Sequence, residues 1–249
     1  MTYCVAMSLS RGLLFASDSR TNAGVDHVSS FCKMSVFERA GEGAIVLLNS
    51  GNLATTQQVV SRLRKHESAL GVPLAAMDSL FSVAELVGET LRVVIAHTRG
   101  ESVVQADVDF TATFLVGGQV RGEEPRLFLV YPQGNFIEST EDTSFFQIGE
   151  SKYGKPILDR VIRPDIDLAD AVKCTLVSFD STIKSNLSVG LPIDLAFIES
   201  GSLRLTQRYR IGVDDAYFRD LRKGWGQGLR RVFNDLPAPD WLQFDQRPG

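Results

Sequence analysis

The order of strands and helices in the sequence predicts a four-layer αββα sandwich, an α/β (α+β) fold. Strands come first, and two helices, more strands, two helices and final strands follow. Two sheets packed together, with helices on their outer faces, fit that order. The chain has 249 residues, of which 44% are hydrophobic and 22% charged, and this composition suits a buried core with an ordinary polar surface.

The first strands follow from short apolar runs that end at turn residues. Thr2–Met7 and Leu13–Asp18 lie on either side of Arg11-Gly12, so we expect a β-hairpin. That hairpin would bring Asp18 close to Thr2. A polar loop is expected over Thr21–Ser30. The next two strands are predicted at Lys33–Phe37 and Ala44–Leu48.

Two helices and a second group of strands come next. Gly-Gly, Pro-Gln-Gly-Asn and acidic turns separate the short apolar runs of this group. The helices are expected at Leu53–Ala69 and Val83–Ala96, and the strands at Thr111–Val116, Arg126–Tyr131, Phe136–Ser139 and Phe145–Ile148.

The last third of the chain returns to helices and then to strands. Helices are predicted at Tyr153–Val161 and Leu168–Lys184, and the second has apolar residues at the spacing of one helical face. Two strands, Ile193–Ile198 and Leu203–Tyr209, precede a final helix, Asp214–Phe233. We expect a single domain over residues 1–249, with a core from about residue 2 to 210. Residues 211–249 are expected to form a C-terminal helix and a proline-containing tail.

Thr2 is the first candidate for a catalytic residue. If Met1 is removed, the threonine gains a free α-amine, which titrates near ~8 and can act as general base for its own hydroxyl. The small side chain at position two suits methionine removal. Many chains begin Met-Thr without any such chemistry, so Thr2 alone predicts little.

Asp18 and Lys33 strengthen the prediction. Lys33 lies near the start of a strand that could direct its ammonium toward Thr2. A lysine beside a hydroxyl and an amine stabilises the alkoxide and lowers the pKa of the amine, and a carboxylate orients that lysine. The alternatives are turn chemistry for Asp18 and a solvated strand end for Lys33.

The segment from Thr2 to Lys33 resembles the start of a proteasome β subunit, with the nucleophile, aspartate and lysine at matching intervals. The run Asn49-Ser50-Gly51-Asn52-Leu53 continues the resemblance. It implies that the Gly51 N–H forms the oxyanion hole, a contact worth about 3 kcal/mol in other acyl-transfer sites. Glycine between a strand and a helix also has a purely conformational use.

Three longer segments resemble a bacterial, proteasome-related branch of this family. The resemblance implies the αββα fold of the N-terminal nucleophile hydrolases and a self-associating ring or helical assembly. The three segments are Asp18 to Gly24, Phe146 to Pro156 and Asn186 to Asp194.

Two serines match further positions of the family network. The resemblance implies that Ser151 contacts the nucleophile's amine and a water, and that Ser188 closes the same network. The usual aspartate between them has no clear counterpart, because Ser185 stands there and Asp180 lies five residues earlier. Losing that carboxylate would orient the amine less firmly and weaken catalysis. Both serines could instead be helix caps or turn residues.

Composition and motifs argue against several other classes. The net charge of −4 disfavours nucleic acid as the main partner, although arginines cluster between Arg219 and Arg231. No paired-ligand spacing suggests a metal, no phosphate-binding glycine motif suggests a nucleotide, and we expect no cofactor. Three dispersed cysteines fit a reducing cytoplasm. We expect no signal peptide and no membrane span.

These observations predict a proteasome-like, threonine-type peptidase that acts on a peptide or amide substrate through an acyl-enzyme, with an activity weakened by the missing network carboxylate. Two alternatives stay open: an N-terminal nucleophile amidase acting on a small-molecule amide, and a weakly active or non-catalytic self-assembling scaffold. Asn49, Leu53 and Ser35 suggest only a small or mixed substrate pocket. The sequence identifies neither the subunit number nor an unfoldase partner.

Overall fold

The structure is a computed structural model that describes residues 2–22, 28–70, 73–101 and 108–241. It divides into two units, Met1–Val213 and Asp214–Gly249. Within the described residues, the first unit contains two five-stranded antiparallel sheets and a two-stranded hairpin, and the second contains helix α5 (Ala216–Asp235). The predicted four-layer sandwich is confirmed in the first unit.

The first sheet has the strand order β10-β1-β2-β11-β12, with β1 and β2 joined as the predicted hairpin. Because β1 lies between β10 and β2, its N-terminal end has a neighbouring strand on both sides. The strands are β1 (Tyr3–Leu9), β2 (Gly12–Asp18), β10 (Phe145–Gly149), β11 (Ile193–Glu199) and β12 (Gln207–Ile211).

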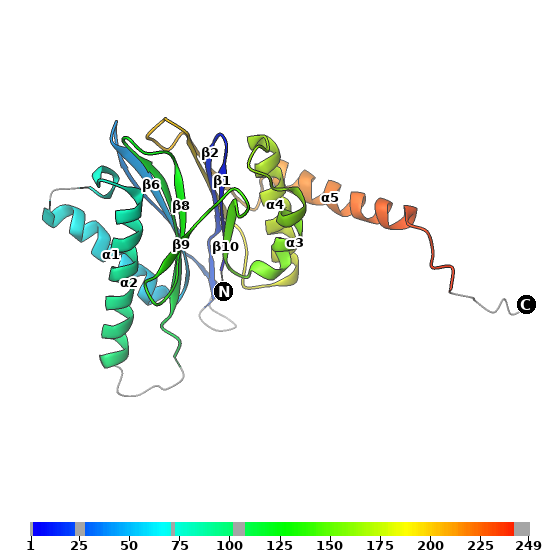
Figure 1. The fold of residues 1–249 in the computed structure, drawn as a ribbon. Helices are drawn as coiled ribbons and strands as arrows, with labels where there is room; N and C mark the ends of the chain where they lie inside the picture. The colour runs from blue at the N-terminus through cyan, green and yellow to red at the C-terminus, as the bar shows by residue number, and fades with distance from the viewer. Residues whose placement is uncertain (1, 23–27, 71–72, 102–107, 242–249) are drawn as a thin grey trace, which may run out of the picture. The chain divides into compact units, whose positions relative to one another are not determined.

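The second sheet has the order β5-β6-β7-β8-β9. Its strands are β5 (Met34–Arg39), β6 (Gly43–Gly51), β7 (Ala112–Val120), β8 (Arg126–Val130) and β9 (Phe136–Glu138). Helices α1 (Leu53–Leu70) and α2 (Leu80–Glu101) cover its outer face, and a 3-10 turn, η1 (Leu74–Ala76), lies between them in the chain (Figure 1).

The apolar run in β6 explains how two hydrophobic layers form. Ile45 and Leu47 belong to the cluster that joins the second sheet to α1 and α2. Val46 and Leu48 alternate with them and belong to the cluster between the two sheets. A strand buried on both faces has this continuous apolar pattern, so β6 is a central strand of the sandwich.

Helices α3 (Ser151–Val161) and α4 (Leu168–Ser185) cover the outer face of the first sheet (Figure 1). The rings of Tyr3 and Phe179 lie 4.6 Å apart, which packs α4 against β1. Asp167 caps α4 by accepting a hydrogen bond from the Ala169 N–H. Helix α4, for which the sequence predicted one apolar face, therefore packs against the Thr2 end of β1.

Several elements differ from the sequence-based expectation, and α2 (Leu80–Glu101) and β7 (Ala112–Val120) are longer than the predicted Val83–Ala96 and Thr111–Val116. A short hairpin, β3 (Arg20–Asn22) and β4 (Val28–Ser30), forms within the predicted loop, because its pairing depends on polar residues that give no apolar alternation. Residues 23–27, which include the end of the Asp18 to Gly24 motif, lie outside the described residues. Lys33 precedes β5, and β12 begins at Gln207 instead of Leu203, which adopts a positive φ of 52°.

The second unit begins with a capped helix. The Asp215 carboxylate accepts a hydrogen bond from the Phe218 N–H at 2.8 Å and so satisfies one free donor of the first turn of α5. Leu229, Val232, Phe233 and Leu236 are exposed. Among the described residues, no helix is both long and apolar enough to cross a bilayer.

Candidate active site

Thr2 lies at the N-terminal end of the central strand β1 and is buried. Its carbonyl oxygen accepts a hydrogen bond from the Glu150 N–H at 2.7 Å. A Cβ on Gly149 would overlap that same carbonyl, and Gly149 has a φ of +83°, so only glycine suits this close approach. Thr2 is thereby fixed against the residues that lead into α3.

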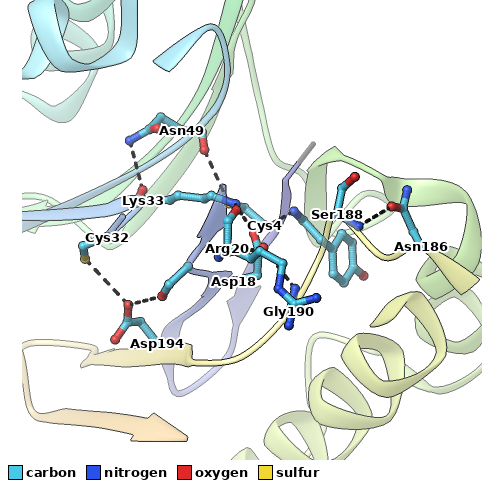
Figure 2. A network of polar contacts seen from close by, with 12 residues as sticks. Cys4, Asp18, Arg20, Cys32, Lys33, Asn49, Asn186, Ser188, Gly190 and Asp194 are labelled. Carbon is cyan, nitrogen blue, oxygen red and sulfur yellow. Dashed lines mark hydrogen bonds and ion pairs between the residues drawn. The ribbon is translucent and has the colours of Figure 1, made fainter. Parts of the chain in front are cut away.

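Asp18 and Lys33 form a buried ion pair next to Thr2. The Lys33 Nζ lies 2.6 Å from the Asp18 Oδ1, and the side chains are 4% and 0% exposed. The same Oδ1 accepts the Tyr3 N–H at 3.0 Å. Because Tyr3 follows Thr2 directly, one carboxylate oxygen connects the lysine to the backbone of the candidate nucleophile (Figure 2).

The second oxygen of Asp18 accepts two backbone hydrogen bonds. The Arg20 N–H and the Gly190 N–H both lie 3.3 Å from Oδ2. Burial raises the pKa of the Asp18 carboxyl above its ordinary value, while the Lys33 ammonium and the N–H groups of Tyr3 and Gly190 act in the opposite direction. Lys33 also donates to the Arg20 carbonyl at 2.6 Å, so two acceptors fix its ammonium.

Asn49 connects Lys33 to both sheets. Its backbone N–H and its Nδ2 each donate to the Lys33 carbonyl at 3.1 Å. The Cys4 thiol of β1 donates to the Asn49 carbonyl at 3.6 Å. These bonds link the backbone of Lys33 to β6 of one sheet and β1 of the other (Figure 2).

Gly51 is the last residue of β6 and has a φ of +108°. A Cβ at this position would overlap the Thr111 carbonyl oxygen, so the backbone itself requires glycine here. The conformational use of Gly51 therefore exists independently of any oxyanion contact. Its role as an oxyanion donor stays a prediction.

The two predicted serines lie at the ends of helices on the first sheet. Ser151 is the first residue of α3 and follows Glu150, whose N–H binds Thr2. Ser188 follows α4, and its N–H donates to the Asn186 Oδ1 at 2.9 Å. The link between this segment and the ion pair runs through Gly190 and through Arg20, which donates to the Leu187 carbonyl at 2.9 Å. The catalytic roles of both serines stay predictions.

Ser185, at the position of the expected network aspartate, is the last residue of α4, and Asp180 is buried on the same helix. Asp194 is the buried carboxylate that the sequence reasoning missed, and Arg20 and Gly190 were missed as contacts of Asp18. An aspartate inside the apolar run Ile193–Ile198 was the available signal, because a charged residue is rarely buried there without a partner. Backbone contacts from Gly190 leave no comparable signal in a single sequence.

A pocket of about 340 Å³ is lined by Asn49, Leu53 and Ser35, the three residues expected to form it. Its lining also includes Cys32 and carries no charged side chain. A larger pocket of about 450 Å³ is lined by residues of α1 and α2, and neither pocket includes Thr2 or Lys33 in its lining. Among the described residues, no group of three His, Cys, Asp or Glu side chains could hold a metal ion.

The family model described as proteasome subunit matches residues 2–198. The chain belongs to the proteasome subunit family. It is 26% identical to proteasome subunit beta 2 of Pyrobaculum aerophilum over 201 residues, which cover 80% of this chain and 90% of that protein. The family predicted from Thr2, Asp18, Lys33 and Gly51 is thus confirmed.

Solved structures of Anbu show a nearer similarity within the family. Anbu (ancestral beta-subunit) from Yersinia bercovieri is 51% identical, with a TM-score of 0.89 over 96% of this chain and 100% of that chain. A structure described as the helical assembly of the Anbu complex from Pseudomonas aeruginosa is 46% identical, with a TM-score of 0.87 over 96% and 98%. The bacterial proteasome-related branch predicted from the three longer segments is confirmed as Anbu-like.

Proposed function

We propose that this family member is a threonine-type peptidase in which Thr2 becomes the N-terminal nucleophile when Met1 is removed. The observation that carries the proposal is the pair of hydrogen bonds to Asp18 Oδ1, one from Lys33 and one from the Tyr3 N–H. Both the Lys33 ammonium and the backbone N–H that follows Thr2 are therefore held by the same buried oxygen of Asp18.

The proposed reaction begins with proton transfer within Thr2. The free α-amine, directly or through a water, accepts the hydroxyl proton while Lys33 stabilises the alkoxide and Asp18 orients Lys33. Thr2 Oγ attacks the carbonyl carbon of a peptide or amide bond. The Gly51 N–H stabilises the oxyanion, and the amine leaving group takes the proton. Water then hydrolyses the acyl-enzyme and regenerates Thr2. Ser151 and Ser188 orient the amine in this scheme.

The neutral pocket is lined by Asn49, which binds the Lys33 carbonyl, and it supports a substrate with an uncharged side chain next to the cleaved bond. Its lining combines polar Asn49 and Ser35 with apolar Leu53. A charged side chain would enter such a pocket without an opposite charge to compensate its lost hydration. We therefore propose peptides with neutral residues at that position.

Self-association is part of the proposal, because the similar Pseudomonas aeruginosa protein is described as a helical assembly. Location in the cytoplasm is supported by three free cysteines, of which Cys4 and Cys174 are buried. A non-catalytic scaffold is the second candidate, and Ser185 at the position of the expected aspartate favours it.

Mass spectrometry of the protein purified from its native cells tests the first requirement, the loss of Met1. Labelling with a threonine-directed peptide epoxyketone then tests nucleophilicity, because the reagent requires both the hydroxyl and the free amine. We expect a mature Thr2 terminus and one adduct per chain. Thr2→Ala abolishes the adduct and the peptide hydrolysis, while Thr140→Ala on an exposed loop leaves both unchanged.

Three outcomes would contradict the proposal in different ways. Retention of Met1 in cells would exclude Thr2 as nucleophile, and hydrolysis that survives in Thr2→Ala would assign the activity elsewhere. A mature Thr2 that neither labels nor hydrolyses peptides would favour the scaffold. Turnover of small amides without turnover of unfolded peptides would favour the amidase.

A further inference from the structure

Asp194 of β11 lies outside the proposed catalytic set, yet its carboxylate is buried at 2% exposure. Its Oδ2 accepts the Ser19 hydroxyl at 3.1 Å and the Cys32 thiol at 3.6 Å. Its Oδ1 faces the half-exposed Arg210 of β12, with 3.3 Å between Oδ1 and Nη1. Burying a carboxylate is costly unless it is paired, so these three contacts have to compensate its lost hydration.

The two residues bound to Oδ2 occupy informative positions in the chain. Ser19 lies between Asp18 and Arg20, and these are the two residues that accept hydrogen bonds from the Lys33 ammonium. Cys32 directly precedes Lys33 itself. Oδ2 of Asp194 therefore contacts two segments of the site. Through Ser19 it contacts the segment with the hydrogen-bond acceptors of the Lys33 ammonium, and through Cys32 it contacts the segment that contains Lys33 (Figure 2).

We infer that Asp194 is a positioning residue that sets the geometry of the Asp18–Lys33 pair through Ser19 and Cys32. It contacts neither member of the pair and takes no part in proton transfer. The Cys32 Sγ also lies 3.1 Å from the Met34 carbonyl oxygen, so the single thiol proton is shared between that carbonyl and the Asp194 carboxylate. The activity part of this inference rests on the proposed function, whereas the contacts themselves do not.

A simple structural role would connect Asp194 to Arg210 and thereby β11 to β12. The Asp194–Arg210 ion pair gives this structural role little weight, because Arg210 is 50% exposed and partly exposed ion pairs contribute little to stability. The antiparallel pairing of β11 and β12 already joins Asp194 to Arg210 through the backbone register. The contacts from Ser19 and Cys32, in contrast, converge on Oδ2, and the pairing of β11 with β12 does not supply them.

The thiol of Cys32 provides a readout that does not need enzyme activity. Cys32 is exposed, whereas Cys4 and Cys174 are buried, and burial raises the pKa of the Cys174 thiol to about 11. A thiol reagent such as dithionitrobenzoate should therefore report on Cys32 in the folded protein. Burial raises the pKa of the Cys32 thiol, Asp194 raises it further, and the contact with the Met34 backbone lowers it.

The test compares Asp194→Asn with wild type in the full-length mature protein. The amide keeps the shape of the side chain but removes its charge. Without that charge the Cys32 thiol loses its proton more easily, and we expect dithionitrobenzoate to react about threefold faster or more. We expect kcat for a peptide to fall between about tenfold and a hundredfold with KM nearly unchanged, because small displacements of catalytic groups act on the chemical step.

Two further variants complete the experiment. Ser19→Ala removes one donor to Asp194 and keeps the charge of the carboxylate, and it should lower kcat in the same direction even if Asp194→Asn does not fold. Glu199→Gln makes the same type of charge-removing change in β11, where, among the described residues, the Glu199 carboxylate contacts the exposed Arg11 alone. It should leave both the thiol rate and kcat within about twofold of wild type.

An unchanged thiol rate in a folded Asp194→Asn variant would overturn the inference, and so would an unchanged kcat in both Asp194→Asn and Ser19→Ala. A wild-type protein with no hydrolytic activity would contradict the proposed function but would leave the thiol rate to decide the contact between Asp194 and Cys32. The two failures are therefore distinguishable.

Discussion

At the residue scale, Asp18 acts as the junction between segments that are far apart in the sequence. Its two oxygens accept hydrogen bonds from Tyr3, Lys33, Arg20 and Gly190. Tyr3 and Lys33 are near enough along the chain for a hairpin and the next strand to bring them together. Gly190 follows a helix that packs on the other side of the sheet, and it completes the coordination of the carboxylate only in the folded chain.

The burial of this pair predicts how Lys33→Met should behave. Removing the cation leaves a buried carboxylate without its counter-charge, and we expect a loss of about 3–5 kcal/mol in the free energy of unfolding at neutral pH. The pKa of Asp18 is already raised by burial, and it should rise further in the variant. Urea denaturation followed by near-ultraviolet circular dichroism measures the loss, and epoxyketone labelling should disappear.

The sign of the pH dependence follows from that raised pKa. A carboxyl that binds its proton more tightly in the folded state than in the unfolded state contributes stability below its unfolded pKa. That stability is lost as the pH rises through the folded pKa. The deficit of Lys33→Met relative to wild type should therefore shrink as the pH falls, because Asp18 becomes neutral.

Two variants control this experiment. Asp18→Asn together with Lys33→Met removes both charges and should regain most of the stability without any labelling, since replacing a whole buried pair is far cheaper than breaking it. Lys155→Met breaks a pair with Asp159 of the same 2.6 Å length but on the surface, and should cost less than about 1 kcal/mol. Equal losses in Lys33→Met and Lys155→Met would show that the buried pair has no special weight.

What the sequence predicted at this scale was limited to residues with recognisable chemistry. Thr2, Asp18 and Lys33 could be found because a hairpin and the following strand place them within reach of one another. Asn49 was expected only in the pocket, yet it binds the Lys33 backbone twice. That contact depends on how β6 lies beside the segment before β5, and the alternation of apolar residues does not encode this detail.

At the element scale, α3 approaches β1 closely because it contains Gly154. The Tyr3 hydroxyl contacts the Ser178 hydroxyl and the Gln147 amide, so residues of α4 and β10 meet at the end of the Tyr3 side chain. A Cβ on Gly154 would overlap both the Ser178 hydroxyl and the Tyr3 hydroxyl. The α3 backbone therefore packs directly on the residue that follows Thr2.

Gly154→Ala should destabilise this contact by about 1–3 kcal/mol, because the added methyl group forces α3 away from β1. Gly224→Ala is the matched control on α5, where nothing lies within 4 Å of the added Cβ, and it should stabilise its helix by about 0.5–1 kcal/mol. Amide hydrogen exchange reports the two helices separately. Unchanged or greater protection of α3 in Gly154→Ala would show that the helix packs less tightly than this geometry requires.

The elements were predictable where burial leaves a pattern. The apolar run of β6 and the one-sided face of α4 gave the correct element types because each buries defined faces. The hairpin of β3 and β4 was missed because polar residues form it, and the start of β12 was misplaced because most of its side chains are exposed. Such segments become strands through backbone hydrogen bonds, and these leave no pattern of buried side chains in the sequence.

At the scale of the whole molecule, the described candidate site residues all belong to the first unit, from Thr2 to Ser188. The family match ends at residue 198, before α5 begins. The residues that support the proposed chemistry are therefore separate in sequence from the exposed apolar residues of α5.

Self-association should be visible in the purified full-length protein. We expect sedimentation velocity to show species larger than the 27.4 kDa chain, with the average mass rising as the protein is concentrated. If only the folded chain associates, mass action also raises the midpoint of thermal unfolding with concentration. Thr2→Ala should assemble like wild type, because it removes a buried side chain at the site and no surface group. A monomer at every concentration would separate this chain from the assembling Pseudomonas aeruginosa protein. An assembly lost in Thr2→Ala would instead show that the site and the subunit contacts depend on one another.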